Sequence, residues 1–282
     1  MDKIFILFQN IVPQHLLSRC TGFLAGLRSP QWLKNWLIQQ FIRHFNVDMS
    51  EAAEPDYTRY VCFNDFFTRP LRDGARPLAS ADILCPADGA ISQLGEIANG
   101  LLFQAKGRYF SAEDLLGGDE ARAAQFQGGQ FATIYLSPKD YHRVHMPVAG
   151  RLTGTCYIPG QLFSVNGVTA ENVDRLFARN ERLVCYFDTA HGPMAMVLVG
   201  AMVVAGIETV WSGQVAPPPK TPVSVDYLNL PEPVELAKGD EMGRFMLGST
   251  VILLFPEGVM DFDERYLAGT STRMGEALAS YQ

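Results

Sequence analysis

Short apolar runs dominate the chain from about residue 80 to its end, and they restrict its fold more than any other feature of the sequence. The runs at residues 132–136, 183–187 and 251–255 are examples, and Gly, Pro, Asp and Asn bound such runs. Apolar segments of this length, bounded by residues that favour turns, are characteristic of β-strands. The sequence therefore predicts a strand-rich and mainly antiparallel body.

The first 45 or so residues have a helical pattern instead. Ser29 as the N-cap and Pro30 in the first helical position predict the start of the clearest helix. Apolar side chains then recur every three or four residues, at Trp32, Leu33, Trp36, Leu37, Phe41 and Phe45. The opposite side is expected to carry the polar residues Lys34, Asn35, Gln39, Gln40 and Arg43. This amphipathic helix is expected either to pack on the protein's own core or to bury its apolar face at a lipid interface.

Helical and strand-like segments that occupy separate parts of a sequence predict an α+β fold. We expect N-terminal amphipathic helices packed on a β-rich body of sandwich or barrel character. The expected boundary separates a helical, membrane-associating region at residues 1–60 from a β-rich domain at residues 61–282.

Charge is distributed unevenly along the chain. Residues 1–50 contain five Lys or Arg against two Asp, a balance of +3, and the remainder contains 18 basic against 28 acidic residues, a balance of −10. A basic, apolar front on an acidic body is typical of a protein at an anionic membrane surface. The net charge of −7, with no basic run interleaved with aromatic residues, argues against nucleic acid as a partner.

The cysteines and histidines form no disulfide or metal pattern. The five cysteines are scattered and include no C-x-x-C pair, which fits a reducing cytoplasm. His142 and His145 stand three residues apart, but no third ligand follows at a recognisable spacing, so we expect no bound metal. No motif includes the other three histidines, His15, His44 and His191.

A Gly-Ser-Thr step, Gly248 to Thr250, leads into the last apolar run. By spacing alone this step is an ordinary turn before a strand, because Gly and Ser are common in turns. A serine hydrolase would also use Ser249, but the sequence contains no G-x-S-x-G motif.

The same step belongs to an ordered set of motifs. LGST at residues 247–250 follows FNDFFTRPLR at 63–72, PADG at 86–89, QAKG at 104–107, YLSPKDYHRVHMP at 135–147, PGQLFSVN at 159–166 and LFARNER at 176–182. Together these motifs resemble the bacterial phosphatidylserine decarboxylase family, and the resemblance covers nearly the whole chain. The departures are minor: Lys139 stands where arginine is expected, and AGI at 205–207 where GSI is commoner.

The resemblance implies a proenzyme that cuts itself between Gly248 and Ser249. Attack of the Ser249 hydroxyl on the preceding carbonyl gives an ester, elimination leaves dehydroalanine, and water then releases ammonia. Gly248 lacks a Cβ and so permits the strained backbone that this attack requires. The implied products are a large chain, residues 1–248, and a small chain, residues 249–282, whose first residue is a pyruvoyl group made from Ser249.

The resemblance also implies roles for four other side chains. His145 is the base that activates Ser249, and Asp88 orients His145. His142 returns a proton to the substrate after CO2 leaves, as an imidazole with a pKa of about 6.5 can do at neutral pH. Ser164 contacts the lipid head group. By local context alone, Asp88 is better explained as a turn residue in an Asp-Gly pair, and the two histidines as one surface and one structural residue.

The implied activity is that of a carboxy-lyase, which converts phosphatidylserine to phosphatidylethanolamine and CO2 through a Schiff base between the substrate amine and the pyruvoyl carbonyl. The two cleaved chains would form an α/β heterodimer, and two such heterodimers would form a homodimer. This assembly would associate peripherally with the cytoplasmic face of the inner membrane. A small amino acid as substrate, an uncut serine hydrolase and an uncut lipid-binding protein are the alternatives. The amphipathic N-terminal segment favours a lipid over a soluble amino acid.

Overall fold

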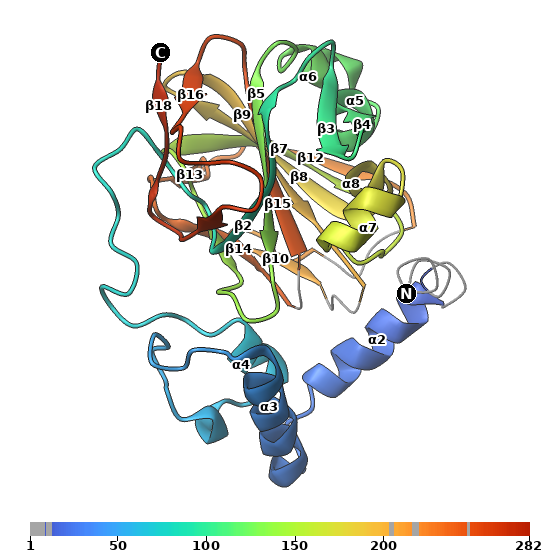
Figure 1. The fold of residues 1–282 in the computed structure, drawn as a ribbon, viewed down its shortest axis with the longest axis vertical. Helices are drawn as coiled ribbons and strands as arrows, with labels where there is room; N and C mark the ends of the chain where they lie inside the picture. The colour runs from blue at the N-terminus through green and yellow to red at the C-terminus, as the bar shows by residue number, and fades with distance from the viewer. Residues whose placement is uncertain (1–8, 10–12, 203–205, 216–219, 247–248) are drawn as a thin grey trace.

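The computed structural model describes Gln9 and residues 13–202, 206–215, 220–246 and 249–282. N-terminal helices lie at one end of a strand-rich body, so the predicted α+β fold is confirmed (Figure 1). The helices of the N-terminal part are α2 (Gln14–Ala25), α3 (Gln31–Phe45), the 3-10 helix η1 (Tyr57–Arg59) and α4 (Phe63–Phe67). Short helices within the body are α5 (Ala112–Leu115), α6 (Glu120–Ala124), α7 (Gly167–Asn172) and α8 (Leu176–Arg179).

Helix α3 is the amphipathic helix expected from the sequence, with two corrections. It begins one residue later than predicted, because Pro30 keeps an extended backbone (ψ 146°) and takes the N-cap position assigned to Ser29. Lys34, which was expected on the polar side, is buried. Its Nζ donates hydrogen bonds to the backbone carbonyls of Thr58 (2.8 Å) and Tyr60 (2.5 Å). These acceptors offset the cost of removing the ammonium group from water.

The inner side of α3 packs on the segments that follow it in sequence. Ile38 of α3 is buried together with Tyr60 and the two phenylalanines of α4, Phe66 and Phe67. The ring of Phe41 in α3 meets both phenylalanines edge to face, and Tyr60 meets Phe66 in the same way, a favourable geometry for such pairs. The helices therefore form a small core of their own that continues as far as Phe67.

The outer sides of α2 and α3 carry large apolar side chains. Trp32 and Trp36 of α3 are 71% and 54% exposed. Phe23 of α2 is 70% exposed, and Leu16 and Leu24 are also exposed. Among the described residues, no helix has both the length and the apolar character needed to span a membrane.

One large antiparallel sheet forms the centre of the body. Its strand order is β12-β7-β8-β9-β15-β5-β2-β17, with β13 also paired to β7. The apolar runs at residues 132–136, 183–187 and 251–255 lie in β5, β8 and β15, as predicted. The strands are β2 (Gly89–Glu96), β5 (Gln130–Leu136), β7 (Gly150–Ile158), β8 (Arg182–Thr189), β9 (Gly192–Val199), β12 (Val223–Asp226), β13 (Glu235–Leu236), β15 (Ser249–Phe255) and β17 (Ser271–Thr272).

Both faces of this sheet are buried, which explains why its central strands are apolar without interruption. Val251 and Leu253 of β15 belong to one hydrophobic core, and the alternate residues Ile252 and Leu254 belong to another. The first core is shared with a sheet of β1 (Ile83–Leu84), β16 (Met260–Phe262) and β18 (Ala277–Tyr281), and with a sheet of β6 (Arg143–His145), β10 (Ile207–Thr209), β11 (Gly213–Gln214) and β14 (Glu241–Phe245). The second core is covered by α5, α7, α8 and the hairpin of β3 (Leu101–Ala105) and β4 (Arg108–Ser111).

Candidate active site

Three neighbouring strands of the large sheet have their ends at the same edge. β2 begins at Gly89, β5 ends at Leu136 and β15 begins at Ser249. Ser249 is paired in register with Leu136, and one residue further in Tyr135 of β5 pairs with both Thr250 and Ala90. Strand pairing alone therefore brings together three parts of the chain: the residue that precedes β2, the turn that follows β5 and residue 249.

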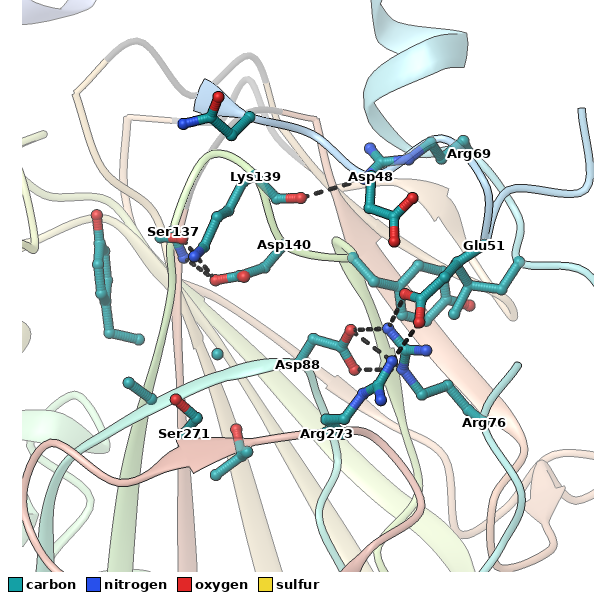
Figure 2. A pocket seen from close by; sticks show the side chains of 17 residues that line it. Asp48, Glu51, Arg69, Arg76, Asp88, Ser137, Lys139, Asp140, Ser271 and Arg273 are labelled. Atoms are coloured by element: carbon teal, nitrogen blue, oxygen red, sulfur yellow. Dashed lines mark hydrogen bonds and ion pairs between the residues drawn. The ribbon is translucent and has the colours of Figure 1, made fainter. Parts of the chain in front are cut away.

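A cavity of about 500 Å³ opens at this edge, between the body and the N-terminal helical part (Figure 2). Segments from across the whole chain line it. The side chains include Asp48, Glu51, Arg69, Arg76, Asp88, Tyr135, Ser137, Lys139, Asp140, Tyr141, Ser271 and Arg273. The cavity thus combines the predicted Asp88 with residues from 249–282 and from the N-terminal part.

Asp88 is held by an ion-pair network on one side of the cavity (Figure 2). Its carboxylate accepts hydrogen bonds from Arg76, whose Nε lies 3.0 Å from Oδ1, and from the backbone N–H of Met274 at 2.8 Å. Arg76 also donates to Glu51 at 2.7 Å, and Glu51 pairs in turn with Arg273. The hydrogen bond from Arg76 is the main reason why the pKa of Glu51 is lowered. The network fixes Asp88 as a positioned carboxylate at the start of β2.

His145 lies on β6, near Asp88, but it does not bond to that carboxylate. Its Nδ1 is 2.8 Å from the carbonyl oxygen of Gly239 and its Nε2 is 3.0 Å from the hydroxyl of Tyr141. A carbonyl only accepts, so Nδ1 carries the hydrogen and Nε2 presents its lone pair to the Tyr141 hydroxyl. Burial lowers the pKa of His145, while the hydrogen bond to the Gly239 carbonyl, the charge of Glu241 and, more weakly, the charge of Asp88 counter this effect. His145 is consequently a neutral base in this structure.

His142 is fully buried and adjoins the segment that leads to residue 249. Its backbone carbonyl accepts from the N–H of Phe245, the last residue of β14, at 3.0 Å. Its ring packs on Phe67 with centroids 4.1 Å apart, and Nδ1 lies 2.8 Å from the carbonyl of Asp140, to which it donates. Nε2 has no hydrogen-bond partner within the described part of the chain. Burial lowers the pKa of His142 to about 3, so the value of about 6.5 assumed from the sequence does not apply to the protein in this state.

The turn after β5 is itself a polar structure. Asp140 accepts hydrogen bonds from both the backbone N–H and the hydroxyl of Ser137, each at 2.7 Å. Burial raises the pKa of Asp140, and the bonds from Ser137 partly offset the rise. The turn thereby holds the carbonyls of Lys139 and Asp140 toward Arg69 and His142.

Ser164 lies apart from this cavity. Its backbone N–H donates to Oε1 of Gln9 at 2.7 Å, and its hydroxyl is 3.5 Å from the N–H of Asn166. It is not among the residues that line the cavity, so its role toward a head group stays a prediction. Gly248 lies outside the described residues, and the structure places the backbone of Ser249 as the first residue of β15.

Several residues of the cavity had received no role from the sequence. Arg69 and Tyr141 belong to motifs that carried the resemblance, so their motifs were a signal that composition did not provide. Glu51, Arg76 and Arg273 lie outside those motifs and meet only in the folded chain.

Comparison with known proteins places this chain in a family. The model of the phosphatidylserine decarboxylase family matches residues 63–280, which is more than half of the chain. The chain belongs to the phosphatidylserine decarboxylase family. A second family model, described as PSD, matches residues 4–46 in the helical part.

Individual relatives in this family align over the full length. The chain is 59% identical to the phosphatidylserine decarboxylase proenzyme of Ectopseudomonas mendocina, over 100% of this chain and 99% of the relative. Proteins of the same name from Alcanivorax borkumensis and Pseudomonas aeruginosa (strain LESB58) are 55% and 57% identical, each over 99% of this chain and 97% of the relative. The family likeness therefore includes the helical part as well as the body.

The burial of His142 predicts how the stability of this family member depends on pH. The folded-state pKa of about 3 lies below the unfolded value of about 6.5, so between these values the unfolded chain binds a proton that the folded chain does not. The stability contribution is therefore complete above about pH 6.5 and is lost as the pH falls toward 3. We expect Ser249→Ala to stay a single uncut chain. In urea unfolding, its free energy of unfolding should fall by about 1.4 kcal/mol more between about pH 7.5 and 5.5 than that of the same chain with His142→Gln. His44→Gln, at an exposed histidine, is the matched control and should leave the difference unchanged; equal pH dependence in all three chains would show that His142 titrates normally.

Proposed function

We propose that this chain is a phosphatidylserine decarboxylase proenzyme that cuts itself between Gly248 and Ser249, turns Ser249 into a pyruvoyl group and converts phosphatidylserine to phosphatidylethanolamine and CO2. The observation that carries this proposal is the position of residue 249, which opens a central strand beside the strand ends and turns that hold Asp88, His142 and His145. Family membership supplies the reaction class, and this arrangement supplies the groups that the reaction needs.

Self-cleavage starts with a proton transfer from the Ser249 hydroxyl. The lone pair of His145 Nε2 is the acceptor, either directly or through the Tyr141 hydroxyl that it faces in this structure. The charge of Glu241 and, more weakly, that of Asp88, which Arg76 holds in place, favour the protonated imidazole electrostatically, and Asp88 does so without a direct hydrogen bond. This is a different use of Asp88 from the orienting contact expected from the sequence.

The bond changes of the cleavage balance without an added reactant other than water. The Ser249 oxygen forms an ester with the carbonyl carbon of Gly248, and the peptide C–N bond breaks as the nitrogen takes a proton. Removal of the Cα proton then expels the Gly248 carboxylate, so the Cβ–O bond breaks and residue 249 becomes dehydroalanine. Its tautomer takes up water and releases ammonia, which leaves a ketone at the new N-terminus.

The two products remain associated because the small chain is part of the sheet. β15 pairs with β5 on one side and β9 on the other, β17 pairs with β2, and β18 pairs with β1. Arg273 also binds Glu51 in the large chain. An α/β heterodimer therefore follows from strand pairing and ion pairing without a covalent link.

Decarboxylation uses the new ketone. The pyruvoyl group would supply a carbonyl able to condense with the substrate amine and to withdraw electrons as CO2 leaves. His142 suits the accompanying proton transfers, because its buried Nε2 has no partner among the described residues and adjoins the segment that leads to residue 249. The neutral imidazole takes a proton from the substrate ammonium as the amine is consumed and returns it to the substrate carbon after CO2 departs. The anionic groups of the substrate favour this protonation, since a nearby negative charge raises an imidazole pKa.

The helical part supports a membrane-bound substrate. Trp32, Trp36 and Phe23 are exposed on α2 and α3, which is the arrangement expected of helices that bury apolar side chains at a lipid interface. We place the enzyme peripherally at the cytoplasmic face of the inner membrane, as a homodimer of the α/β unit, with residues 1–60 as the membrane-associating region and residues 61–282 as the catalytic domain.

The proposal is tested by CO2 release from phosphatidylserine labelled in its carboxylate and carried in anionic vesicles. Wild-type protein should release labelled CO2, and cyanoborohydride added with the substrate should inactivate it and link the substrate amine to the small chain. Ser249→Ala should release none. Release of fatty acid or glycerol products without CO2 would instead indicate a hydrolase, and vesicle binding without any reaction would indicate a lipid-binding protein.

A further inference from the structure

Arg69 is a buried cation without an acidic partner among the described residues. The residue is 3% exposed. Its Nη2 donates to the backbone carbonyl of Lys139 at 3.2 Å, while Nε and Nη1 have no hydrogen-bond partner in the described part of the chain. Burial lowers the pKa of Arg69, and Asp88 and Asp140 attract it only at longer range. A guanidinium group in this position normally requires an anion.

The other two arginines of the cavity are already neutralised. Arg76 pairs with Asp88 and Glu51, and Arg273 pairs with Glu51. Both lie on the Asp88 side of the cavity, whereas Arg69 lies on the opposite side with Lys139 (Figure 2). The cavity cations that have no ion pair within the described part of the chain are therefore Arg69 and Lys139, and of these two Arg69 is the buried one.

Arg69 is also close to the groups that carry the proposed chemistry. Its contact with Lys139 places it over the turn after β5, the strand that pairs with Ser249. The same turn binds His142, which packs on Phe67, two residues before Arg69. The proposed substrate reacts through its amine at residue 249. An anionic group a few bonds from that amine would extend toward this guanidinium group.

Building on the function proposed above, we propose that Arg69 binds the phosphodiester of the lipid substrate and thereby anchors the head group for reaction at residue 249. The substrate has two anionic groups, and the chemistry selects between them. Its carboxylate leaves as CO2, so a cation bound to it would stabilise the ground state and be lost in the transition state. The phosphodiester is unchanged by the reaction, so binding it positions the substrate without opposing the loss of CO2.

The test compares wild type, Arg69→Gln and Arg72→Gln as full chains on short-chain phosphatidylserine in mixed micelles. Arg72 is the matched control, because it is an exposed arginine in the same motif and is not among the residues that line the cavity. Arg69→Gln should cut itself and raise KM on the order of 10- to 100-fold, with a smaller change in kcat, as expected for loss of a charged hydrogen bond to substrate. Arg72→Gln should match wild type.

Three soluble inhibitors identify the anion. Glycerophosphoethanolamine carries the phosphodiester without the carboxylate, L-serine carries the carboxylate without the phosphate, and inorganic phosphate carries neither the ester nor the amine. Glycerophosphoethanolamine should inhibit wild type and lose its effect on Arg69→Gln, while inhibition by serine stays the same. Loss of serine inhibition instead would assign Arg69 to the carboxylate, and equal potency of inorganic phosphate and the diester would indicate a general anion site; either result overturns the proposal.

The outcomes also separate this proposal from the enzyme assignment. A wild-type chain that stays uncut and releases no CO2 would remove the proposed function itself. Cut and active chains with equal KM for wild type and Arg69→Gln would overturn the Arg69 assignment alone. If Arg69→Gln fails to fold or to cut, the same comparison with Arg69→Lys, which keeps the charge but not the planar donor group, should still show a raised KM, and an unchanged value would overturn the assignment.

Discussion

The His145→Ala chain should remain uncut, because cleavage loses the base that takes the proton from Ser249. In the structure His145 is neutral, with Nδ1 donating to Gly239 and the Nε2 lone pair toward the cavity residue Tyr141. General acid–base catalysis contributes about 100- to 10,000-fold. The rate of self-cleavage, measured by denaturing gel electrophoresis, should accordingly be at least about 100-fold lower than in wild type.

His44→Ala provides the matched control for the loss of a histidine. His44 is exposed near the end of α3 and is not among the residues that line the cavity. This variant should cut at the wild-type rate. Normal cleavage of a folded His145→Ala chain would remove His145 from the mechanism and direct attention to Tyr141 or Asp88 as the base.

The His142→Gln variant should separate the two reactions, with normal self-cleavage but little decarboxylation. Glutamine keeps a polar group beside the Asp140 carbonyl but has no nitrogen that can accept a proton as an imidazole does. Release of CO2 should fall at least about 100-fold at saturating substrate, since the loss affects proton transfer rather than binding. Because the cut chains form normally, the pyruvoyl content of the preparation should equal that of wild type.

Two results would contradict this role of His142. A variant that is cut and decarboxylates at the wild-type rate would show that another group moves the proton. A variant that is folded but uncut would place His142 in the cleavage reaction together with His145.

The sequence predicted the body better than the details of the helical part. Strands β5, β8 and β15 follow directly from their apolar runs, because a strand buried on both faces leaves a continuous apolar signal. Lys34 could not be placed correctly from its helical periodicity. Its burial depends on the carbonyls of Thr58 and Tyr60, which belong to a later segment of the chain.

The sequence predicted only those site residues that its motifs contain. The motifs named Asp88, His142 and His145, and the structure gathers these at one edge of the sheet. No local pattern predicts that Arg76 would hold Asp88 or that Glu51 would reach Arg273, a contact across 222 positions of sequence. The lowered pKa of His142 likewise arises from tertiary burial, which the pair of histidines in the sequence does not reveal.

Arg69 illustrates the same limit most clearly. Arginine is usually exposed, so its position in a motif gives no indication that the side chain is buried. In the folded chain its guanidinium group lies over the Phe66 ring and donates to the carbonyl of Lys139, 70 positions further along the sequence.

Intact-protein mass spectrometry of wild type and Ser249→Ala, purified under denaturing conditions, tests the central claim most directly. Wild type should give two chains that end at Gly248 and begin at position 249, with the small chain carrying a pyruvoyl group in place of serine, and Ser249→Ala should give one chain of full length. A wild-type protein that stays a single chain after prolonged incubation with membranes would contradict the self-made cofactor and the decarboxylase mechanism built on it.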